Sequence, residues 1–513
     1  MESTKENRFL SWLAAIRETK TITKINKFIA SPICLAIMAA LTLLAYSFSL
    51  EVIFYGLVVV FAIYVCLFAE DFMPIVPLFL FCYVTSSPKN NPGRAETSMF
   101  YGVGGILIII FASVAVLALL FRLGTDKNMG FKKLFTTKRS LVWGFLALGI
   151  GYVLSGIGSA GYLQVIWKNL FLALLEFLSL FLLYFLFSAT INWEKRDKNY
   201  FVWMMFFFGV LIVGELIASF LLCNVIEGGV IMRGRISAGW GHYNNMGAMI
   251  GVSIPFAMFL SMKYKRGFIF VIVAGLMYLS LFFACSRGSQ LGAGLTFAAS
   301  YVYAAIKTKE KKSFFIASGI FVAVVAILCI VFRDTLTTLF SDVPDIIKSS
   351  ENGTEETEEN LFNDSNRFKT YLGGLKTFIN YPIFGESFYP RKYVPYEYST
   401  VDKFSSFFPP RWHNTFIQML VSCGVVGFAA YVFHRVQTVR LYLKKRDDTT
   451  TFFAFGILAL LAMSMLDCHF FNLGPGFFYS ICLMVIEFAP SDKKKQVAKE
   501  EETPSETSTQ TAE

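Results

Sequence analysis

The chain has 513 residues, of which 55% are hydrophobic and 17% aromatic. Soluble domains are about 45–50% apolar even when glycine is counted, so the composition excludes an ordinary soluble globular protein. The formal net charge of +10 would suit nucleic-acid binding, but the placement of the charges argues against that class. The nine cysteines form no Cys-x-x-Cys pair, and we interpret them as small apolar residues rather than a disulfide framework.

Runs of about 20 apolar residues recur along the chain, which is the length that crosses a bilayer core. We therefore predict an all-α polytopic membrane protein with about 14 transmembrane helices. A polar, basic segment precedes them, and we expect no cleavable signal peptide there. The predicted spans are 31–50, 52–69, 72–86, 99–121, 140–157, 163–190, 200–223, 245–262, 268–285, 289–306, 313–332, 413–433, 451–467 and 476–490.

Lysine and arginine are distributed unevenly between alternate loops. With a cytoplasmic N-terminus, 31 of the 46 cationic residues fall on the cytoplasmic side, as the positive-inside rule expects. The charge then reflects topology and attraction to the anionic inner leaflet. The predicted organisation is a cytoplasmic segment 1–30, transmembrane helices over 31–332, a large extracytoplasmic loop 333–412, transmembrane helices over 413–490 and a disordered cytoplasmic tail 491–513.

Four blocks with arginine or histidine face outward on this topology: "MRGRISAGWGHYNN", "CSRGSQ", "NRFKTYLGGLKTFINYPIFGESF" and "PPRWHNTF". Arg287 lies in a tight turn between apolar spans, where an arginine is costly and suggests function. The alternative is an arginine whose side chain extends to the outer headgroups. Apolar residues at helical spacing over 364–380 predict a helix lying in the outer interface, with Arg367 in its first turn. Arg367 is either functional or merely solvated.

The stretch "RWHNTFIQ" places His413 and Asn414 at the start of the predicted span 413–433. Gly424 and Gly427 follow on one face, where we expect close helix packing. A helix N-terminus disfavours a protonated histidine, and neutral imidazole is the form that a general base needs. The alternative is a histidine that caps the helix or anchors the interface.

Two isolated charges lie within predicted spans, Lys168 and Glu215. Such residues are rare in membranes and usually pair with one another or hold a substrate. We favour a structural ion pair between the two, with substrate binding as the alternative.

Taken in order, the outward blocks resemble the O-antigen ligase/polymerase superfamily of bacterial membrane glycosyltransferases. "RISAGWGHYNNMGAMI" resembles its Arg-x-x-Gly…Asn segment and "SRGSQLGA" its Ser-Arg-Gly turn. "NRFKTYLGGLKTFINYPIFGESF" resembles its Arg-aromatic…Pro-x-x-Gly block, and "HNTFIQMLVSCGVVGF" its His-Asn…Gly-x-x-Gly signature. The resemblance covers roughly residues 230–435. The chain departs from the family at Tyr243-Asn244-Asn245, often Asn-Pro-Asn, and at Gly385-Glu386-Ser387, often Gly-x-Gly.

The resemblance implies a metal-independent, inverting glycosyltransferase without a cofactor, in the bacterial cytoplasmic membrane, with its active site on the outer face. The implied donor is an undecaprenyl-diphosphate-linked glycan, and the acceptor is a glycan, lipid or protein hydroxyl. A chain-length regulator or a flippase would be a further partner, and no nucleic acid is expected. The implied site consists of His413 as general base with Glu386 in reserve, Arg235, Arg287 and Arg367 on the diphosphate, and Asn414 and Arg411 orienting donor or base.

Three classes of function stay open at this point. Within the family we prefer a polymerase of a surface polysaccharide over a ligase, because nothing in the sequence argues for an outer membrane. A flippase of lipid-linked oligosaccharide is the second class, but transporters usually show paired broken helices near the midplane. A structural scaffold is the third, and it leaves the outward arginines unexplained.

Overall fold

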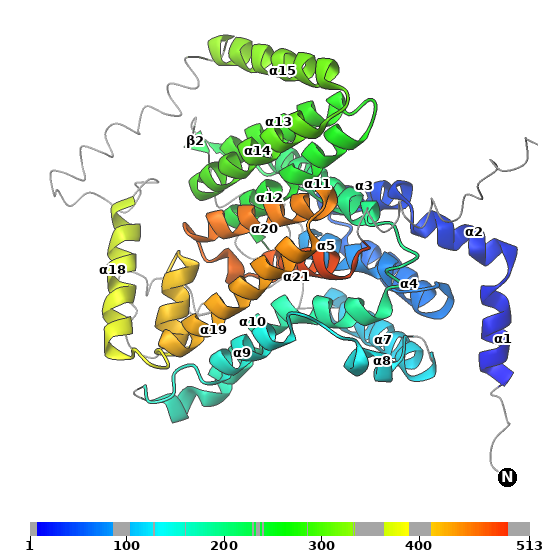
Figure 1. Cartoon of the computed structure of the whole chain (residues 1–513), viewed down its shortest axis with the longest axis horizontal. Helices are drawn as coiled ribbons and strands as arrows, with labels where there is room; N and C mark the ends of the chain where they lie inside the picture. Colours follow the sequence, from blue (N-terminus) through cyan, green and yellow to red (C-terminus); the bar gives the residue numbers. More distant parts are fainter. Residues whose placement is uncertain are drawn as a thin grey trace, which may run out of the picture.

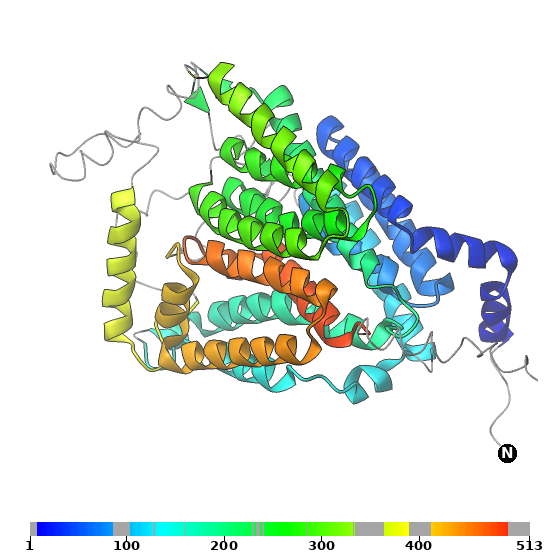
Figure 2. The ribbon, with the colours of Figure 1, turned by 45° about the horizontal axis from the view of Figure 1, so that its top comes forward.

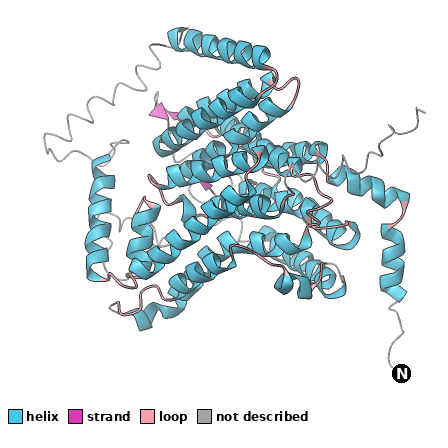
Figure 3. Cartoon of the chain, in the orientation of Figure 1, coloured by secondary structure: helices cyan, strands magenta, loops and turns pink. Residues whose placement is uncertain are grey.

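The structure is a computed structural model, and Figure 1 shows a bundle of long helices. Two helices lie across the direction of most others, at opposite edges of the view: α18 (Asp364–Asn380) and α1 (Arg8–Arg17). Figure 3 shows how little of the described chain is strand. The described residues are 8–85, 103–126, 129–159, 161–227, 230–231, 236–238, 241–284, 286–331, 333, 364–388 and 412–490.

Each predicted span coincides with helix. In chain order these are α3 (Pro32–Phe48), α4 (Glu51–Phe68), η1 with α5 (Met73–Ile75 and Val76–Val84), α7 (Val103–Thr125), α9 (Val142–Val153), α10 (Tyr162–Thr190), α11 (Asn199–Leu222), α12 (Tyr243–Lys263), α13 (Phe268–Phe283), α14 (Arg287–Lys307), α15 (Lys311–Val331), α19 (Thr415–Lys445), α20 (Asp448–Ser464) and α21 (Leu473–Phe488). The helical class predicted from the apolar runs is therefore confirmed.

The number of membrane spans is a separate question. Among the described residues, six helices are long and apolar enough to cross a membrane, or seven if the bent pair α2 (Lys20–Ile29) and α3 counts as one. Several others, such as α13 and α21, are apolar but shorter. The predicted count of about 14 spans therefore stays a prediction.

The remaining described elements are short or peripheral. The predicted helix over 364–380 is present as α18. The helices α1, α2, α8 (Phe131–Thr136) and η4 (His469–Phe471) were not predicted, and neither were two hairpins, β1 (Ile226–Glu227) with β2 (Val230–Ile231) and β3 (Ser237–Ala238) with β4 (Gly241–His242). The hairpins lie between the end of α11 and the start of α12.

The bundle has two chemically different ends. At one end Lys198, just before α11, forms an ion pair of 2.6 Å with Asp447, which caps α20. The basic loops 263–267 and 307–312 lie at this end too, because they follow α12 and α14. At the other end α12 and α20 meet where Asn244 donates to Asp467. We call these the basic end and the histidine end, the latter after His413.

The core lies around α12. Residues 245–261 of this helix are all buried, since α11, α13, α14 and α20 surround it. A helix that is apolar on every side suits such a central position. Close approach to α14 requires a glycine, because a Cβ at Gly247 would lie 2.8 Å from the hydroxyl of Ser289.

The predicted span 413–433 lies in a longer helix, and that helix is not regular. Helix α19 continues to Lys445, and it breaks at Gly424, which has φ 62° and ψ −164°. Figures 1 and 2 show the part before the break turning away from the longer part that follows. Gly424 therefore breaks the helix rather than packing it, whereas Gly427 does approach Gly151 of α9 closely. Residues after 433, assigned to a cytoplasmic loop, are helical.

The segment after α18 fills the break in α19 through backbone hydrogen bonds. The N–H groups of Glu386 and Ser387 donate to the carbonyls of Val421 and Ser422, at 2.7 and 3.2 Å. In return the N–H groups of residues 425 and 426 donate to the carbonyls of residues 382 and 383, at 2.8 and 3.2 Å. Backbone groups freed by a helix break in a membrane must be satisfied within the protein, and residues 382–388 do this.

The expected ion pair between Lys168 and Glu215 is not present. Lys168 is exposed on α10, whereas Glu215 is fully buried on α11. Neither carboxylate oxygen of Glu215 has a hydrogen-bond partner among the described residues. Lys168 lies on an exposed face of its helix and Glu215 on a buried face of another. The sequence of each helix alone does not show which faces of two helices meet.

Replacing Gly424 by alanine tests the helix break. An added Cβ would collide with the carbonyl of Ile383, and the backbone has a conformation that L-residues avoid. We expect Gly424→Ala to destabilise the protein by about 3 kcal/mol or more, measured as a lower Tm in detergent. Gly56→Ala is the control, since a Cβ there meets nothing within 4 Å. Equal Tm values for both variants would contradict the assigned role of Gly424.

Replacing Glu386 by glutamine tests the burial of its carboxyl group. Burial raises the pKa of Glu386 to about 7, so the folded state binds more protons than the unfolded state between about pH 5 and 7. The contribution of Glu386 to the free energy of unfolding is then greatest at low pH and falls as pH rises through that window. We expect Glu386→Gln to raise Tm at pH 8 and to change it little at pH 5. Glu194→Gln, at an exposed site, controls for the substitution itself.

Candidate active site

His413 lies at the start of the short first part of α19, in a strained backbone conformation with φ 49°. A non-glycine residue in this region costs free energy and is often found at functional sites. Its carbonyl accepts a hydrogen bond of 3.0 Å from the hydroxyl of Tyr371 on α18. Helix α18 therefore holds the backbone of His413 directly.

The imidazole of His413 faces a carboxylate from the loop after α20. Its Nδ1 lies 3.3 Å from Oδ1 of Asp467. The other carboxylate oxygen accepts from the side-chain amide of Asn244 at 2.8 Å, and the N–H of Cys468 donates to Oδ1 at 2.7 Å. The side chain of His413 is 34% exposed and that of Asp467 15%. The imidazole of His413 is thus accessible at the protein surface, while the more buried carboxylate of Asp467 contacts its Nδ1.

These contacts determine where the proton between His413 and Asp467 lies. Burial by itself would raise the pKa of Asp467. The hydrogen bond from His413 and the nearby charge of His469 outweigh burial and hold that pKa well below its usual range. An ionised carboxylate only accepts hydrogen bonds, so Nδ1 of His413 carries the shared proton. In the neutral imidazole Nε2 is then the atom with a free lone pair, which is the form of a general base.

Asn414 is the N-cap of α19 and is fully engaged within the protein. Its Oδ1 accepts from the N–H groups of Phe416 and Ile417 at 2.9 and 3.1 Å. Its Nδ2 donates to the carbonyl of Met465 at 2.7 Å. Such a cap favours helix initiation at the next residue. Of the two roles predicted for Asn414, this geometry favours orienting the base over binding the donor.

The first residues of α12 and α14 complete this end of the bundle. Asn245 accepts from the amide of Asn472 at 2.8 Å and lies 3.2 Å from Nδ1 of His469. Arg287 is the first residue of α14 and is half-buried. The next residue, Gly288, approaches Leu466 so closely that a Cβ would lie 3.0 Å from the leucine Cβ. The start of α14 therefore packs directly on the segment that carries Asp467.

An arginine in the middle of α19 anchors the same loop from the interior. The guanidinium carbon of Arg435 lies 3.9 Å from the ring centre of Phe470, and 4.6 and 4.5 Å from those of Tyr431 and Tyr479. Its side-chain nitrogens are buried and have no hydrogen-bond partner among the described residues. Cation–π contacts are stronger when desolvated. Phe470 follows Asp467 by three residues, so Arg435 fixes the loop that holds the carboxylate.

The structure gathers some of the predicted site residues and not others. His413, Asn414 and Arg287 share the histidine end. The backbone of Glu386 is hydrogen-bonded to that of Val421. Val421 is eight residues after His413, so at about 1.5 Å per helical residue about 12 Å separates Glu386 from His413. The two candidate bases are therefore not part of one cluster. Arg367 lies in the first turn of α18, and the predicted residues outside the described part of the chain are Arg235 and Arg411.

Sequence reasoning missed Asp467, His469 and the role of Asn244. The sequence-based candidates lie in or next to the blocks that resemble the family, and Asp467 lies outside those blocks. Asp467 was counted as the last residue of an apolar span, although "LDCHF" places a carboxylate and a histidine at the outward end of that span. An ionisable residue at a span end on the same side as His413 was the available signal.

Comparison with known families bears on this same end of the molecule. Residues 272–432 match the family model described as O-antigen ligase. The matched region covers 161 of the 513 residues. A comparison with curated proteins gave no match. The matched region of the O-antigen ligase domain includes Arg287, His413 and Asn414, whereas Asp467 follows it.

The match confirms the resemblance on which the expected function depends. It places the protein in a membrane role of glycan processing during O-antigen assembly, with ligase- or polymerase-type glycosyl transfer as the activity of the family. Among the residues that the structure describes, no group of three or more His, Cys, Asp and Glu side chains is placed to hold a metal ion. The metal independence of the O-antigen ligase domain stays a prediction.

Replacing Asp467 by asparagine tests the partnership with His413. The amide keeps the shape of the carboxylate but loses its charge, so Nδ1 no longer holds its proton as firmly. The same change in a hydrolase triad lowers kcat by about 10⁴-fold, because the histidine takes the wrong tautomer. We expect Asp467→Asn to reduce the rate of glycan transfer by about 100-fold or more, with little change in Tm. Asp448→Asn, at the basic end, is the control, and equal rates for the two variants would refute the partnership.

Proposed function

We propose that the protein transfers or polymerises glycan from an undecaprenyl-diphosphate-linked oligosaccharide on the outer face of the bacterial cytoplasmic membrane, in surface polysaccharide assembly. The observation that carries this proposal is the contact between His413 and Asp467, at the bundle end opposite the basic loops. Basic loops favour the cytoplasmic side, so the histidine end faces outward in this proposal and both termini are cytoplasmic.

His413 acts as the general base in the proposed reaction. Its Nε2 takes the proton of the acceptor hydroxyl, and the hydroxyl oxygen attacks the anomeric carbon of the donor glycan. The bond between that carbon and the diphosphate oxygen breaks, and the diphosphate leaves with the electron pair. A single displacement of this kind inverts the anomeric configuration. Asp467 stays ionised and stabilises the imidazolium that forms, as the carboxylate does in hydrolase triads.

The leaving diphosphate needs positive charge that does not depend on pH. Arginine provides it, because the guanidinium is always charged and its planar fork matches phosphate oxygens. Arg287 is the best-supported candidate, since α14 begins beside the Asp467 segment. We propose Arg235 and Arg367 as further diphosphate ligands and Arg411 as an orienting group. Stabilising the charge that develops on the leaving group is electrostatic catalysis.

Two other functions are less well supported. A ligase to a lipid or protein acceptor would use the same base and the same arginines, so only the acceptor distinguishes it from a polymerase. A flippase of lipid-linked oligosaccharide would use broken helices to line a substrate path. The break at Gly424 is instead filled by residues 382–388, which argues against that use.

A turnover assay tests the proposed function. Purified protein in nanodiscs would receive a synthetic polyprenyl-diphosphate oligosaccharide with EDTA present, and product length would be followed by mass spectrometry. We expect longer glycans from the wild type, a loss of at least 100-fold in His413→Gln, and a weaker apparent affinity for the donor in Arg287→Ala. Arg440→Ala, an exposed arginine in the last turns of α19, is the matched control.

Each alternative gives a different result in this assay. Donor binding without a longer product, followed by transfer when a lipid or peptide acceptor is added, would identify a ligase. Full transfer by His413→Gln would eliminate His413 as the base. Loss of all activity with EDTA, restored by a divalent cation, would overturn the metal-independent mechanism.

A further inference from the structure

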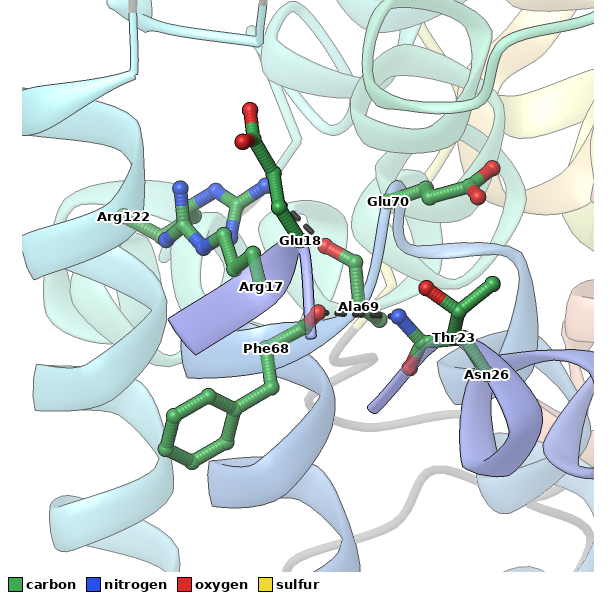
Figure 4. Close-up of a pocket in the computed structure, with 8 residues that line it drawn as sticks. All are labelled: Arg17, Glu18, Thr23, Asn26, Phe68, Ala69, Glu70 and Arg122. Atoms are coloured by element: carbon green, nitrogen blue, oxygen red, sulfur yellow. Dashed lines mark hydrogen bonds between the residues drawn. The ribbon is translucent and has the colours of Figure 1, made fainter. Parts of the chain in front are cut away.

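A cavity of about 410 Å³ lies at the basic end, because its lining residue Glu70 forms an ion pair of 3.3 Å with Arg196, two residues before Lys198. It is bounded by α1, α2, the end of α4 and the end of α7, and Figure 4 shows its walls. The lining residues are Arg17, Glu18, Thr23, Asn26, Phe68, Ala69, Glu70 and Arg122. A polar cavity with two arginines at a membrane edge suits an anionic ligand.

The carbonyl groups at the end of α4 are already satisfied. Arg122 donates to the carbonyls of Cys66 and Ala69, both at 3.1 Å, and its Nε lies 2.8 Å from Asp126. Asn26 donates to the carbonyl of Phe68 at 3.0 Å. These residues form the inner wall of the cavity and hold its shape. They are not available to bind a ligand without breaking those bonds.

Arg17 is differently placed, and Figure 4 shows its side chain beside that of Arg122. Among the described residues, only its Nε donates to a carbonyl, that of Leu67 at 2.7 Å, and its Nη1 lies 4.0 Å from Asp126. Burial and then repulsion from Arg122 lower the pKa of Arg17 to about 10, so it stays charged at neutral pH. A second anion beside the two guanidinium groups would relieve this repulsion.

Helix α2 provides the rest of the positive charge. It meets α3 at a bend of 64°, so it does not continue the direction of that helix. On α2 the residues Lys20, Lys24 and Lys27 share one face, and Ile25 and Phe28 are exposed on another. Such a helix is suited to the interface of a bilayer, with apolar side chains toward the acyl chains and lysines toward anionic headgroups.

We propose that this cavity, together with α2, binds the headgroup of an anionic phospholipid from the leaflet at the basic end. The lipid phosphate would lie against Arg17, and Lys24 and the neighbouring lysines would attract it. Headgroup hydroxyls, as in phosphatidylglycerol, would donate to the rim carboxylates of Glu18 and Glu70. The exposed apolar residues of α2 favour a lipid over free phosphate, since a soluble anion gains nothing from them.

Native mass spectrometry of the full chain from mixed micelles tests this proposal. The micelles would contain equal amounts of phosphatidylglycerol and phosphatidylcholine, and the readout is the ratio of the two lipids retained. We expect the wild type to favour phosphatidylglycerol and Arg17→Gln/Lys24→Gln to lower the ratio at least 3-fold. The control is Lys309→Gln/Arg440→Gln, which removes the same charge from exposed sites at the basic end and should keep the wild-type ratio.

The outcomes separate a built site from general attraction. An equal loss in the control variant, or no loss in Arg17→Gln/Lys24→Gln, would overturn the proposal. Displacement of phosphatidylglycerol by inorganic phosphate at millimolar concentration would show that the site binds a free anion, and would overturn the assignment to a lipid. If Arg17→Gln/Lys24→Gln does not fold, Lys24→Gln/Lys27→Gln is the second variant, because both lysines are exposed and should still lower the ratio.

Discussion

The hydrogen bonds between residues 382–388 and the broken part of α19 are the constraint on which the site depends. Four backbone bonds, two in each direction, replace the helical bonds lost at Gly424. Without them the break would leave polar groups unsatisfied in an apolar surrounding, at a cost of several kcal/mol each. The break lets the first part of α19 turn toward α18, and His413 stands at its start. The loop segment thus sets the direction in which the histidine is presented.

The candidate site is assembled from helix ends, not from the middle of spans. Asn244 begins α12, Arg287 begins α14, His413 precedes α19 and Asp467 follows α20. In a bundle of antiparallel neighbours, such ends meet only at one face of the membrane. Residues more than 200 positions apart come into contact this way, as the bond between Asn244 and Asp467 illustrates. Polar groups at this face also avoid the cost of full burial in the bilayer core.

Apolar runs were enough to predict the long apolar helices and α18, because periodicity and length are local properties. The blocks predicted to face outward led to His413 and Arg287, which the structure places at the same end of the bundle, and their catalytic roles stay predictions. The break in α19 was missed because Gly424 reads as an ordinary packing residue, and only the distant segment 382–388 stabilises its conformation. Asp467 was missed for a related reason. Its role depends on a contact across 54 residues, and no local pattern distinguishes such a carboxylate from one that ends a span.

The strained backbone of His413 is tolerated because the surrounding contacts leave it no alternative. Tyr371 donates to its carbonyl, and Asp467 accepts from its ring. The following residue, Asn414, donates to the carbonyl of Met465, just after α20. The loop itself is fixed independently, by Arg435 against Phe470. Strain of this kind persists only where the structure over-determines it. In the proposed reaction, a base held this firmly needs little reorganisation when charge develops on the leaving group, which is the main way that a protein site lowers such a barrier.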